Sequence, residues 1–209
     1  KWAMSADGRT GLPNGESQWI SAKESRSWVH HLRAKCDAVI VGSGTLCSDD
    51  PLLTSRGISV PEPLRVVLTG SLNLPAQAQL WDITQAKTLI AYGPDAVQEK
   101  LRNLPAGPER LKLNSTNPLD LLNALKEKGC NRVLWECGPS LATAAIEMGC
   151  VQELAIVMAP KLLGGAPSMA PLSELGFTSM DQVLQIKNGS MKRVGQDWLL
   201  NFFLPPKAP

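Results

Sequence analysis

The sequence predicts an α/β fold with a mixed, mostly parallel sheet, and two observations lead to this class. Short, continuous apolar runs recur along most of the chain, and segments with helical periodicity lie between several of them. From about residue 182 onward the chain changes character and becomes rich in strand-forming residues. Strands that alternate with helices favour parallel pairing with helices on both faces of the sheet, and the strand-rich end favours an added antiparallel pair.

Several segments have the pattern of β-strands. Residues 1–5 are mostly apolar and end at a turn signal. Continuous apolar runs, which are typical of strands covered on both faces, occupy 38–41, 64–68, 88–92, 132–135 and 153–158. Near the end of the chain, 182–188 and 197–204 are expected to form the antiparallel pair, around a turn at Asn188-Gly189-Ser190.

Helical patterns lie between these strands. Ser21 and Glu24 form a capping box, in which each side chain satisfies a backbone amide of the first turn, and the helix that follows runs to about Ala34. Further helices are expected at about 95–104, 118–128 and 139–148. No linker, repeat or low-complexity tract divides the chain, so residues 1–209 are expected to form a single domain.

The composition argues against several classes of protein. Lys plus Arg total 21 and Asp plus Glu total 19, so the net charge of +2 gives no reason to expect a nucleic-acid partner. No apolar run approaches the ~18 residues that a membrane span needs. The five cysteines are odd in number and no two have C-x-x-C spacing, so we expect free thiols in a reducing compartment, the cytoplasm, and no metal site. His30 and His31 are adjacent, and neighbours on a helix diverge by ~100°, so they do not ligate one metal together.

Ligands of open α/β sheets bind beyond the carboxyl ends of the strands. Such ends here are rich in glycine and polar residues at 42–45, 70–71 and 136–140. The last of these precedes a predicted helix, whose free backbone amides suit a pyrophosphate, although Gly-Pro-Ser before a helix is also plain capping chemistry. The sequence fingerprints of Rossmann dinucleotide sites, P-loops, zinc proteases and α/β-hydrolases are absent.

Individual residues near these strand ends each have a functional and a structural interpretation. Arg33 and Arg56 are either solvated surface residues or a forked clamp on a substrate phosphate, to which guanidinium groups donate paired hydrogen bonds. Glu136 ends an apolar strand, where a carboxylate is costly unless it is paired or contacts a ligand. Asp49 is either part of a turn or an acceptor for sugar hydroxyls, and Trp19, beside a Gly-rich loop, is placed to cover a flat ring.

Several longer motifs occur in order along the chain. They are Lys1-Trp-Ala-Met-Ser-Ala-Asp-Gly-Arg9, Gly15-Glu-Ser-Gln-Trp-Ile-Ser21, Leu32-Arg-Ala34, Asp37-Ala-Val-Ile-Val-Gly-Ser-Gly-Thr45, Asp49-Asp-Pro-Leu-Leu-Thr-Ser-Arg56, Trp135-Glu-Cys-Gly-Pro-Ser-Leu-Ala142, Ala159-Pro-Lys-Leu-Leu-Gly-Gly165 and Val194-Gly-Gln-Asp197. With these motifs, and over nearly its whole length, the sequence resembles the reductase domain of the bacterial bifunctional riboflavin-biosynthesis deaminase/reductase.

The resemblance implies a three-layer, dihydrofolate-reductase-like fold. It also implies NADPH-dependent reduction of 5-amino-6-(5-phosphoribosylamino)uracil to the 5-phosphoribitylamino compound, by hydride transfer to ribose C1′. By position, Lys1 and Glu136 would act in catalysis. The substrate would be contacted by Ser17, Arg33, Leu53, Arg56 and Glu136. The cofactor would be contacted by Ala3, Trp19, Thr45, Asp49, Gly70, Gly138, Pro139, Ser140, Leu141, Ala142, Thr143 and Ala144. The family further implies a homodimer or homotetramer.

Some positions depart from the family's pattern. Ala6 stands where Leu is common, Thr69-Gly70 replaces a commoner Asp-Ser type pair, and Cys137 stands where Gly or Ala is usual. The other half of the bifunctional protein is a zinc deaminase, and none of its motifs occurs here. Because the first residue is Lys1 rather than Met, we expect a deaminase domain to precede it, with zinc only in that domain; a free-standing reductase is the alternative. Two further functions stay open at this point, a related pterin or folate reductase and a non-catalytic nucleotide-binding domain.

Overall fold

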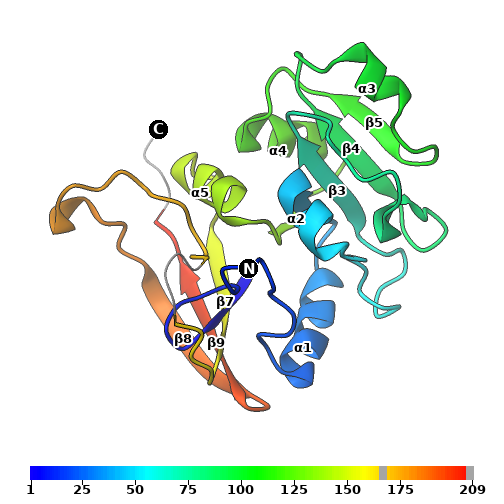
Figure 1. The fold of residues 1–209 in the computed structure, drawn as a ribbon. Coiled ribbons are helices and arrows are strands. Elements are labelled where there is room, and N and C mark those ends of the chain that lie inside the picture. Colours follow the sequence, from blue (N-terminus) through cyan, green and yellow to red (C-terminus); the bar gives the residue numbers. More distant parts are fainter. Residues whose placement is uncertain (165–168, 206–209) are drawn as a thin grey trace. The chain divides into compact units, whose positions relative to one another are not determined.

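The computed structural model describes residues 1–164 and 169–205, which fall into two compact units. The terminal unit comprises Lys1–Trp28 and Pro139–Pro209, and the central unit comprises Val29–Gly138. Each unit contains one sheet (Figure 1). Part of the Pro/Gly-rich motif that ends at Gly165, and residues 166–168 after it, lie outside the described residues.

The central unit contains a five-stranded, all-parallel sheet with the strand order β5-β4-β3-β2-β6. Its strands are β2 (Ala38–Gly42), β3 (Leu64–Thr69), β4 (Thr88–Tyr92), β5 (Glu109–Lys112) and β6 (Val133–Trp135). The apolar runs of the sequence correctly predict four of these strands. Strand β5 has the sequence Glu-Arg-Leu-Lys and lies at the edge of the sheet, so it carries no apolar run that would reveal it.

The helices of this unit follow from local signals, with one exception. Asn117 caps helix α4 (Pro118–Glu127) by accepting a hydrogen bond from the Asp120 amide at 2.7 Å, as its sequence favours. Helix α1 (Lys23–Arg33) contributes its last turn, and α3 (Gln98–Arg102) and the 3₁₀ turn η1 (Gln79–Trp81) are short. Helix α2 (Ser43–Asp49) is the exception, because its Gly-Ser-Gly start gives no helical signal in the sequence. Gly42 is the extended N-cap residue of this helix.

Arg65, at the start of β3, is fully buried and ties together the segments on either side of the strand. Its guanidinium donates hydrogen bonds to five backbone carbonyls, at 3.4 Å to Leu52, 3.4 Å to Gln79, 3.1 Å to Leu80, 2.8 Å to Asp82 and 2.7 Å to Ala86. Burial lowers the pKa of Arg65 against the attraction of Asp82 and Glu62. The direct partners of the Arg65 charge are therefore carbonyl dipoles, and its role is to hold the backbone segments before and after β3 in place.

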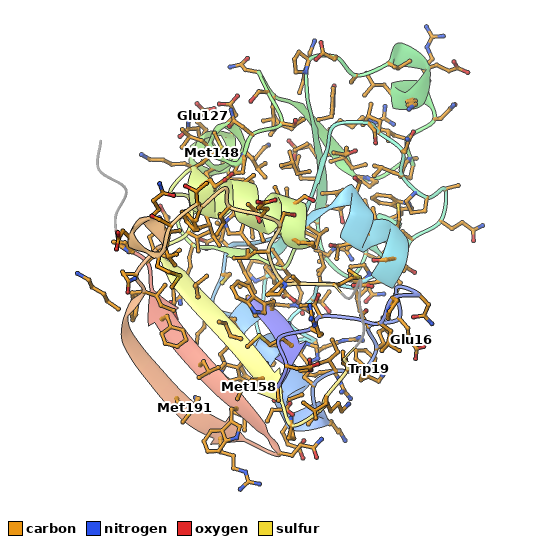
Figure 2. The ribbon with its side chains drawn as sticks, turned by 60° about the vertical axis from the view of Figure 1, so that its left-hand side comes forward. Glu16, Trp19, Glu127, Met148, Met158 and Met191 are labelled. Atoms are coloured by element: carbon orange, nitrogen blue, oxygen red, sulfur yellow. The ribbon has the colours of Figure 1, made fainter. Side chains whose placement is uncertain are left out.

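The terminal unit contains a mixed four-stranded sheet with the order β1-β7-β9-β8. Strand β1 (Trp2–Ser5) pairs parallel with β7 (Glu153–Ala159), and the pairs β7–β9 and β9–β8 are antiparallel. The last two strands are β8 (Lys187–Val194) and β9 (Asp197–Phe203), and Figure 2 shows Met158 on β7 and Met191 on β8. Helix α5 (Pro139–Glu147), the 3₁₀ turn η2 (Met180–Gln182) and the first part of α1, up to Trp28, complete the regular structure of the described residues of this unit.

The turn of the C-terminal hairpin is not where the sequence predicts it. Asn188-Gly189 lies inside β8, at a register shift between Lys187 and Ser190, and the chain turns at Gly195-Gln196, where Gly195 has a φ of +61°. Gly189 is required by packing rather than by a turn, because a Cβ atom there would lie 2.5 Å from the ring of Phe202. Gly189 therefore marks an irregular position inside a strand and not a turn.

The predicted fold class is confirmed: a mostly parallel α/β structure with an antiparallel pair near the C-terminus. Among the described residues, no helix has the length and apolar character of a membrane span. In the same residues, no group of three or more His, Cys, Asp or Glu side chains is arranged to hold a metal ion.

The close approach of Gly189 to the Phe202 ring predicts the outcome of an alanine substitution. Gly189→Ala would force the ring aside and should lower the free energy of unfolding by about 1–3 kcal/mol, as overpacking generally does. Gly44→Ala is the control, because no atom lies within 4 Å of the added Cβ atom and alanine favours helix α2. Chemical denaturation of both variants decides the matter, and equal stability of the two would contradict this packing.

Candidate active site

Arg33 joins three segments of the central unit at one point. It ends helix α1, and its Nε donates to Glu136 Oε1 at 2.6 Å while its Nη2 donates to Glu136 Oε2 at 3.1 Å. Its Nη1 donates to the backbone carbonyl of Thr54 at 3.1 Å. Glu136 directly follows β6, and Thr54 belongs to the loop between α2 and β3. Two of the residues singled out in the sequence, Arg33 and Glu136, are thus brought into direct contact.

The Arg33–Glu136 pair is largely shielded from solvent, with 12% and 10% of the two side chains exposed. Burial alone lowers the pKa of Arg33, but the attraction of Glu136 and the hydrogen bonds to it outweigh burial and raise that pKa. The Arg33 guanidinium is therefore held in its charged form. The forked geometry fixes the plane of the carboxylate, because a bidentate pair defines orientation as well as distance.

His30 lies one helical turn before Arg33 and faces the same cluster. Its Nδ1 atom is buried with no hydrogen-bond partner among the described residues. Burial lowers the pKa of His30, and the positive charges of Arg33 and Arg56 lower it further, against the attraction of Glu136. Arg56 lies two residues after Thr54, whose carbonyl Arg33 binds, so its backbone lies near the ion pair. The imidazole is consequently neutral at neutral pH.

Arg56 is exposed and sits on a tightly turned loop. Its φ is +60°, in the left-handed region, and Gly57 follows with a φ of +79°. The backbone amides of Ser55 and Gly57 donate to the carboxylate of Glu62 at 2.5 Å and 2.7 Å. Leu53, also left-handed, has a side chain only 2% exposed within the apolar core, so only its backbone is placed to meet a substrate.

The remaining candidates of the central unit lie near the strand ends. Thr45 and Asp49 are on helix α2, and a Cβ atom on Gly138 would lie 3.5 Å from Thr45 Oγ1. Gly70 is exposed directly after β3, with only Thr116 Oγ1, at 3.9 Å, near the Cβ position. Burial raises the pKa of the Cys137 thiol to about 11, so this residue, between Glu136 and Gly138, stays protonated and is no nucleophile.

The terminal unit carries the other candidates. Lys1 and Ala3 lie at the start of the chain. Ala3 belongs to β1 and pairs with Val157 of β7. Trp19, labelled in Figure 2, has 62% of its area exposed, and Ser17 lies two residues before it, half-buried. The guanidinium carbon of Arg26 lies 4.3 Å from the centre of the Trp19 ring, so one face of the indole is covered by a cation.

The first turns of helix α5 hold the predicted pyrophosphate segment. Pro139 is the first helical residue and Ser140 is exposed, whereas the side chain of Thr143 is buried. Thr143 Oγ1 accepts a hydrogen bond from the Ser173 amide at 2.9 Å, so it is used to fix a loop of the same unit. The backbone amides of the first turn, which have no partner inside a helix, are the groups available to an anion.

Sequence reasoning missed two residues of the central cluster. His30 could have been found, because three-residue spacing places it on the same face of the helix as Arg33. Glu62 gives no local signal, since its role depends on how the loop folds back upon itself. The structure brings Arg33 and Glu136 into contact, with Arg56 two residues after the Thr54 carbonyl that Arg33 binds, and leaves the residues of the terminal unit to be assigned by position alone.

The lowered pKa of His30 predicts a loss of stability on mild acidification. Below its ordinary pKa of 6.5 the unfolded chain protonates His30 more readily than the folded chain, so stability falls as the pH drops. The plot of melting temperature against pH should therefore be flatter for His30→Gln between about pH 7 and pH 5. The matched control is His31→Gln at the exposed neighbouring position, and identical curves for the two variants would contradict the burial of an unpaired imidazole.

Comparison with known proteins shows to which family the chain belongs. Residues 1–200 match the RibD C-terminal domain model. The chain is 42% identical over 205 residues to the riboflavin biosynthesis protein RibD of Synechocystis, covering 98% of this chain and 56% of that protein. It is 37% identical to the chloroplastic riboflavin biosynthesis protein PYRR of Zea mays, covering 99% of this chain and 33% of that protein.

A solved structure agrees with this match. RibD from Acinetobacter baumannii superposes with a TM-score of 0.82 at 30% identity, over 98% of this chain and 56% of that one. The chain therefore spans about half of the length of the RibD proteins that it matches, and a third of the plant protein. On the strength of the family match and the 42% identity, the chain belongs to the RibD C-terminal domain family.

Proposed function

We propose that this chain reduces 5-amino-6-(5-phosphoribosylamino)uracil to 5-amino-6-(5-phosphoribitylamino)uracil with NADPH, by hydride transfer to C1′ of the sugar. The observation that carries the proposal is the cluster of Arg33, Glu136 and Arg56 in a chain of the RibD C-terminal domain family. A phosphorylated sugar needs a cation for its phosphate and an acceptor for its hydroxyls. Both kinds of group stand together in the central unit, and no protein nucleophile is needed for hydride transfer.

Arg56 is the group best suited to the substrate phosphate. Arg33 donates two hydrogen bonds to the carboxylate of Glu136, so its charge is already compensated. Arg56, in contrast, is exposed. A guanidinium group presents paired donors to phosphate oxygens, which is the reason to assign Arg56 rather than a lysine-like point charge to this role. Arg33 then acts mainly by holding Glu136 and the Thr54 carbonyl in place, with its remaining donor hydrogens directed to the substrate.

Glu136 is suited to orient the sugar. A carboxylate accepts hydrogen bonds only, and its pairing with Arg33 keeps it ionised and fixed in plane. Ribose hydroxyls that donate to it would place C1′ reproducibly, which matters because hydride transfer depends on the distance and alignment of the reacting carbons. Lys1, carried over from the resemblance, would favour the open-chain sugar or polarise C1′. Ser17 and the backbone of Leu53 are assigned as further substrate contacts.

The terminal unit has features that fit a dinucleotide. Trp19 offers a flat, exposed indole backed by Arg26, and the start of α5, residues 139–144, offers backbone amides to a pyrophosphate. Ala3 is assigned to the cofactor with this unit, and Thr45, Asp49, Gly70 and Gly138 are assigned to it in the central unit. When bound, the cofactor supplies the hydride from C4 of its nicotinamide, and one proton completes the conversion of ribosyl to ribityl.

The proposal extends to the cellular compartment and the oligomeric state of the protein. We place the protein in a reducing compartment, the cytoplasm, because all five cysteines are free thiols, and we assign it a homodimeric or homotetrameric state. The fit of Arg56 to a phosphate favours this substrate over a folate or pterin, which carries no sugar phosphate.

The reduction is tested by the loss of NADPH absorbance when the phosphoribosylamino substrate is added. Substrate-dependent oxidation, with the ribityl product identified by mass spectrometry, is expected. Folded protein that binds both compounds and turns over neither would instead indicate the non-catalytic nucleotide-binding domain.

The assignment of Arg56 to the phosphate predicts a specific kinetic defect. Arg56→Ala should raise KM for the phosphoribosylamino substrate about tenfold or more, as expected for loss of a charge-assisted hydrogen bond, while KM for NADPH stays the same. Arg102→Ala, at an exposed position on α3, is the control and should change neither constant. Equal losses with phosphorylated and phosphate-free substrates would contradict the assignment.

A further inference from the structure

Glu62 forms an unusual contact with the loop that carries Arg56. Its two carboxylate oxygens accept from the backbone amides of Ser55, at 2.5 Å, and of Gly57, at 2.7 Å. These are the residues immediately before and after Arg56. One carboxylate therefore clips both ends of a three-residue segment whose middle side chain is the proposed phosphate ligand.

The clipped segment needs such support, because its backbone is in an unfavourable conformation. Arg56 has a φ of +60°, in the left-handed region that is unfavourable for a residue with a Cβ atom. Two amides that converge on one side of a turn form a concavity that attracts anions, and the carboxylate of Glu62 fills it. The hydroxyl of Ser55, which is fully buried, adds a bond of 3.1 Å from the Ser59 amide. The turn is thus fixed from within the loop.

The negative charge of Glu62 is compensated by neighbouring backbone amides and by Arg33. Burial alone raises the pKa of Glu62, but the Gly57 and Ser55 amides and the positive charge of Arg33 outweigh burial and lower it. The carboxylate is therefore ionised at neutral pH, and its charge is met by the turn amides and by Arg33. The Arg56 guanidinium is left to meet a ligand.

We propose that Glu62 is a positioning residue for phosphate recognition: by clipping the amides on either side of Arg56, it presents the guanidinium in the orientation that receives the phosphate of the substrate. This inference rests on the proposed function, from which it takes the role of Arg56. It assigns to Glu62 an effect on ligand binding that passes entirely through Arg56.

Calorimetric titration with ribose 5-phosphate, with ribose as the phosphate-free comparison, tests the inference without turnover. Glu62→Gln keeps one acceptor oxygen and loses the charge, so one of the two amides loses its acceptor. We expect it to weaken binding of ribose 5-phosphate about tenfold, to leave binding of ribose unchanged, and to be partly rescued by Glu62→Asp. In an Arg56→Ala background, Glu62→Gln should change affinity by less than about twofold, because the two residues act as one unit.

The matched control is Asp82→Asn. Asp82 is another loop carboxylate of the central unit that accepts hydrogen bonds from its own turn, at 3.0 Å from the Thr84 amide. Its substitution should leave affinity for ribose 5-phosphate unchanged.

Several results would overturn the inference. Independent, additive losses in the double variant would show that Glu62 does not act through Arg56. Tighter phosphate binding by Glu62→Gln would show that the carboxylate competes with phosphate for the turn amides. Wild-type protein that binds ribose 5-phosphate no better than ribose would also end it, whereas the NADPH assay decides the proposed reaction separately.

Discussion

The buried ion pair between Arg33 and Glu136 is the interaction on which the central unit's cluster depends. It joins the end of helix α1 to the residue after β6, and the remaining bond of Arg33, to the Thr54 carbonyl, adds the loop before β3. A buried pair contributes little net stability against a well-packed apolar alternative, and breaking one partner of such a pair is strongly destabilising. The presence of the pair is therefore better explained by the geometry it imposes than by the stability it adds.

Around this pair, the charges of the described residues are distributed so that the Arg56 guanidinium is available to a ligand. Glu136 compensates Arg33, burial and neighbouring cations hold His30 neutral, and the turn amides and Arg33 receive the charge of Glu62. Arg56 is the exposed guanidinium in this arrangement. Arg65 also holds this loop by donating to the Leu52 carbonyl, and it donates to carbonyls of the segment before β4 as well. Three side chains, those of Arg33, Glu62 and Arg65, thus hydrogen-bond to the backbone of one short loop, which is the expected design when a loop rather than a strand carries a ligand-binding side chain.

The sequence predicts the parts of the fold that depend on local pattern and misses those that depend on tertiary context. Buried strands such as Ala38–Gly42 are evident because both faces are covered, whereas edge strand β5 is charged and leaves no pattern. Asn188-Gly189 is a strong turn signal, yet the ring of Phe202 makes glycine necessary there inside a strand. For the cluster, Arg33, Arg56 and Glu136 are singled out by their positions near the predicted strand ends, and the family resemblance assigns them to the substrate. Their mutual pairing and the role of Glu62 required the folded loop, because they depend on residues distant in the chain.

Contact between Arg56 and the substrate phosphate is tested most directly by phosphorus NMR of the ribityl product bound to the protein, recorded as a function of pH. A guanidinium in contact with the phosphate favours the dianion, so the second pKa of the bound phosphate is expected to lie clearly below the ~6 of a free phosphate monoester. A bound phosphate that titrates as it does in solution would contradict that contact, and with it the assignment of this cluster to substrate binding.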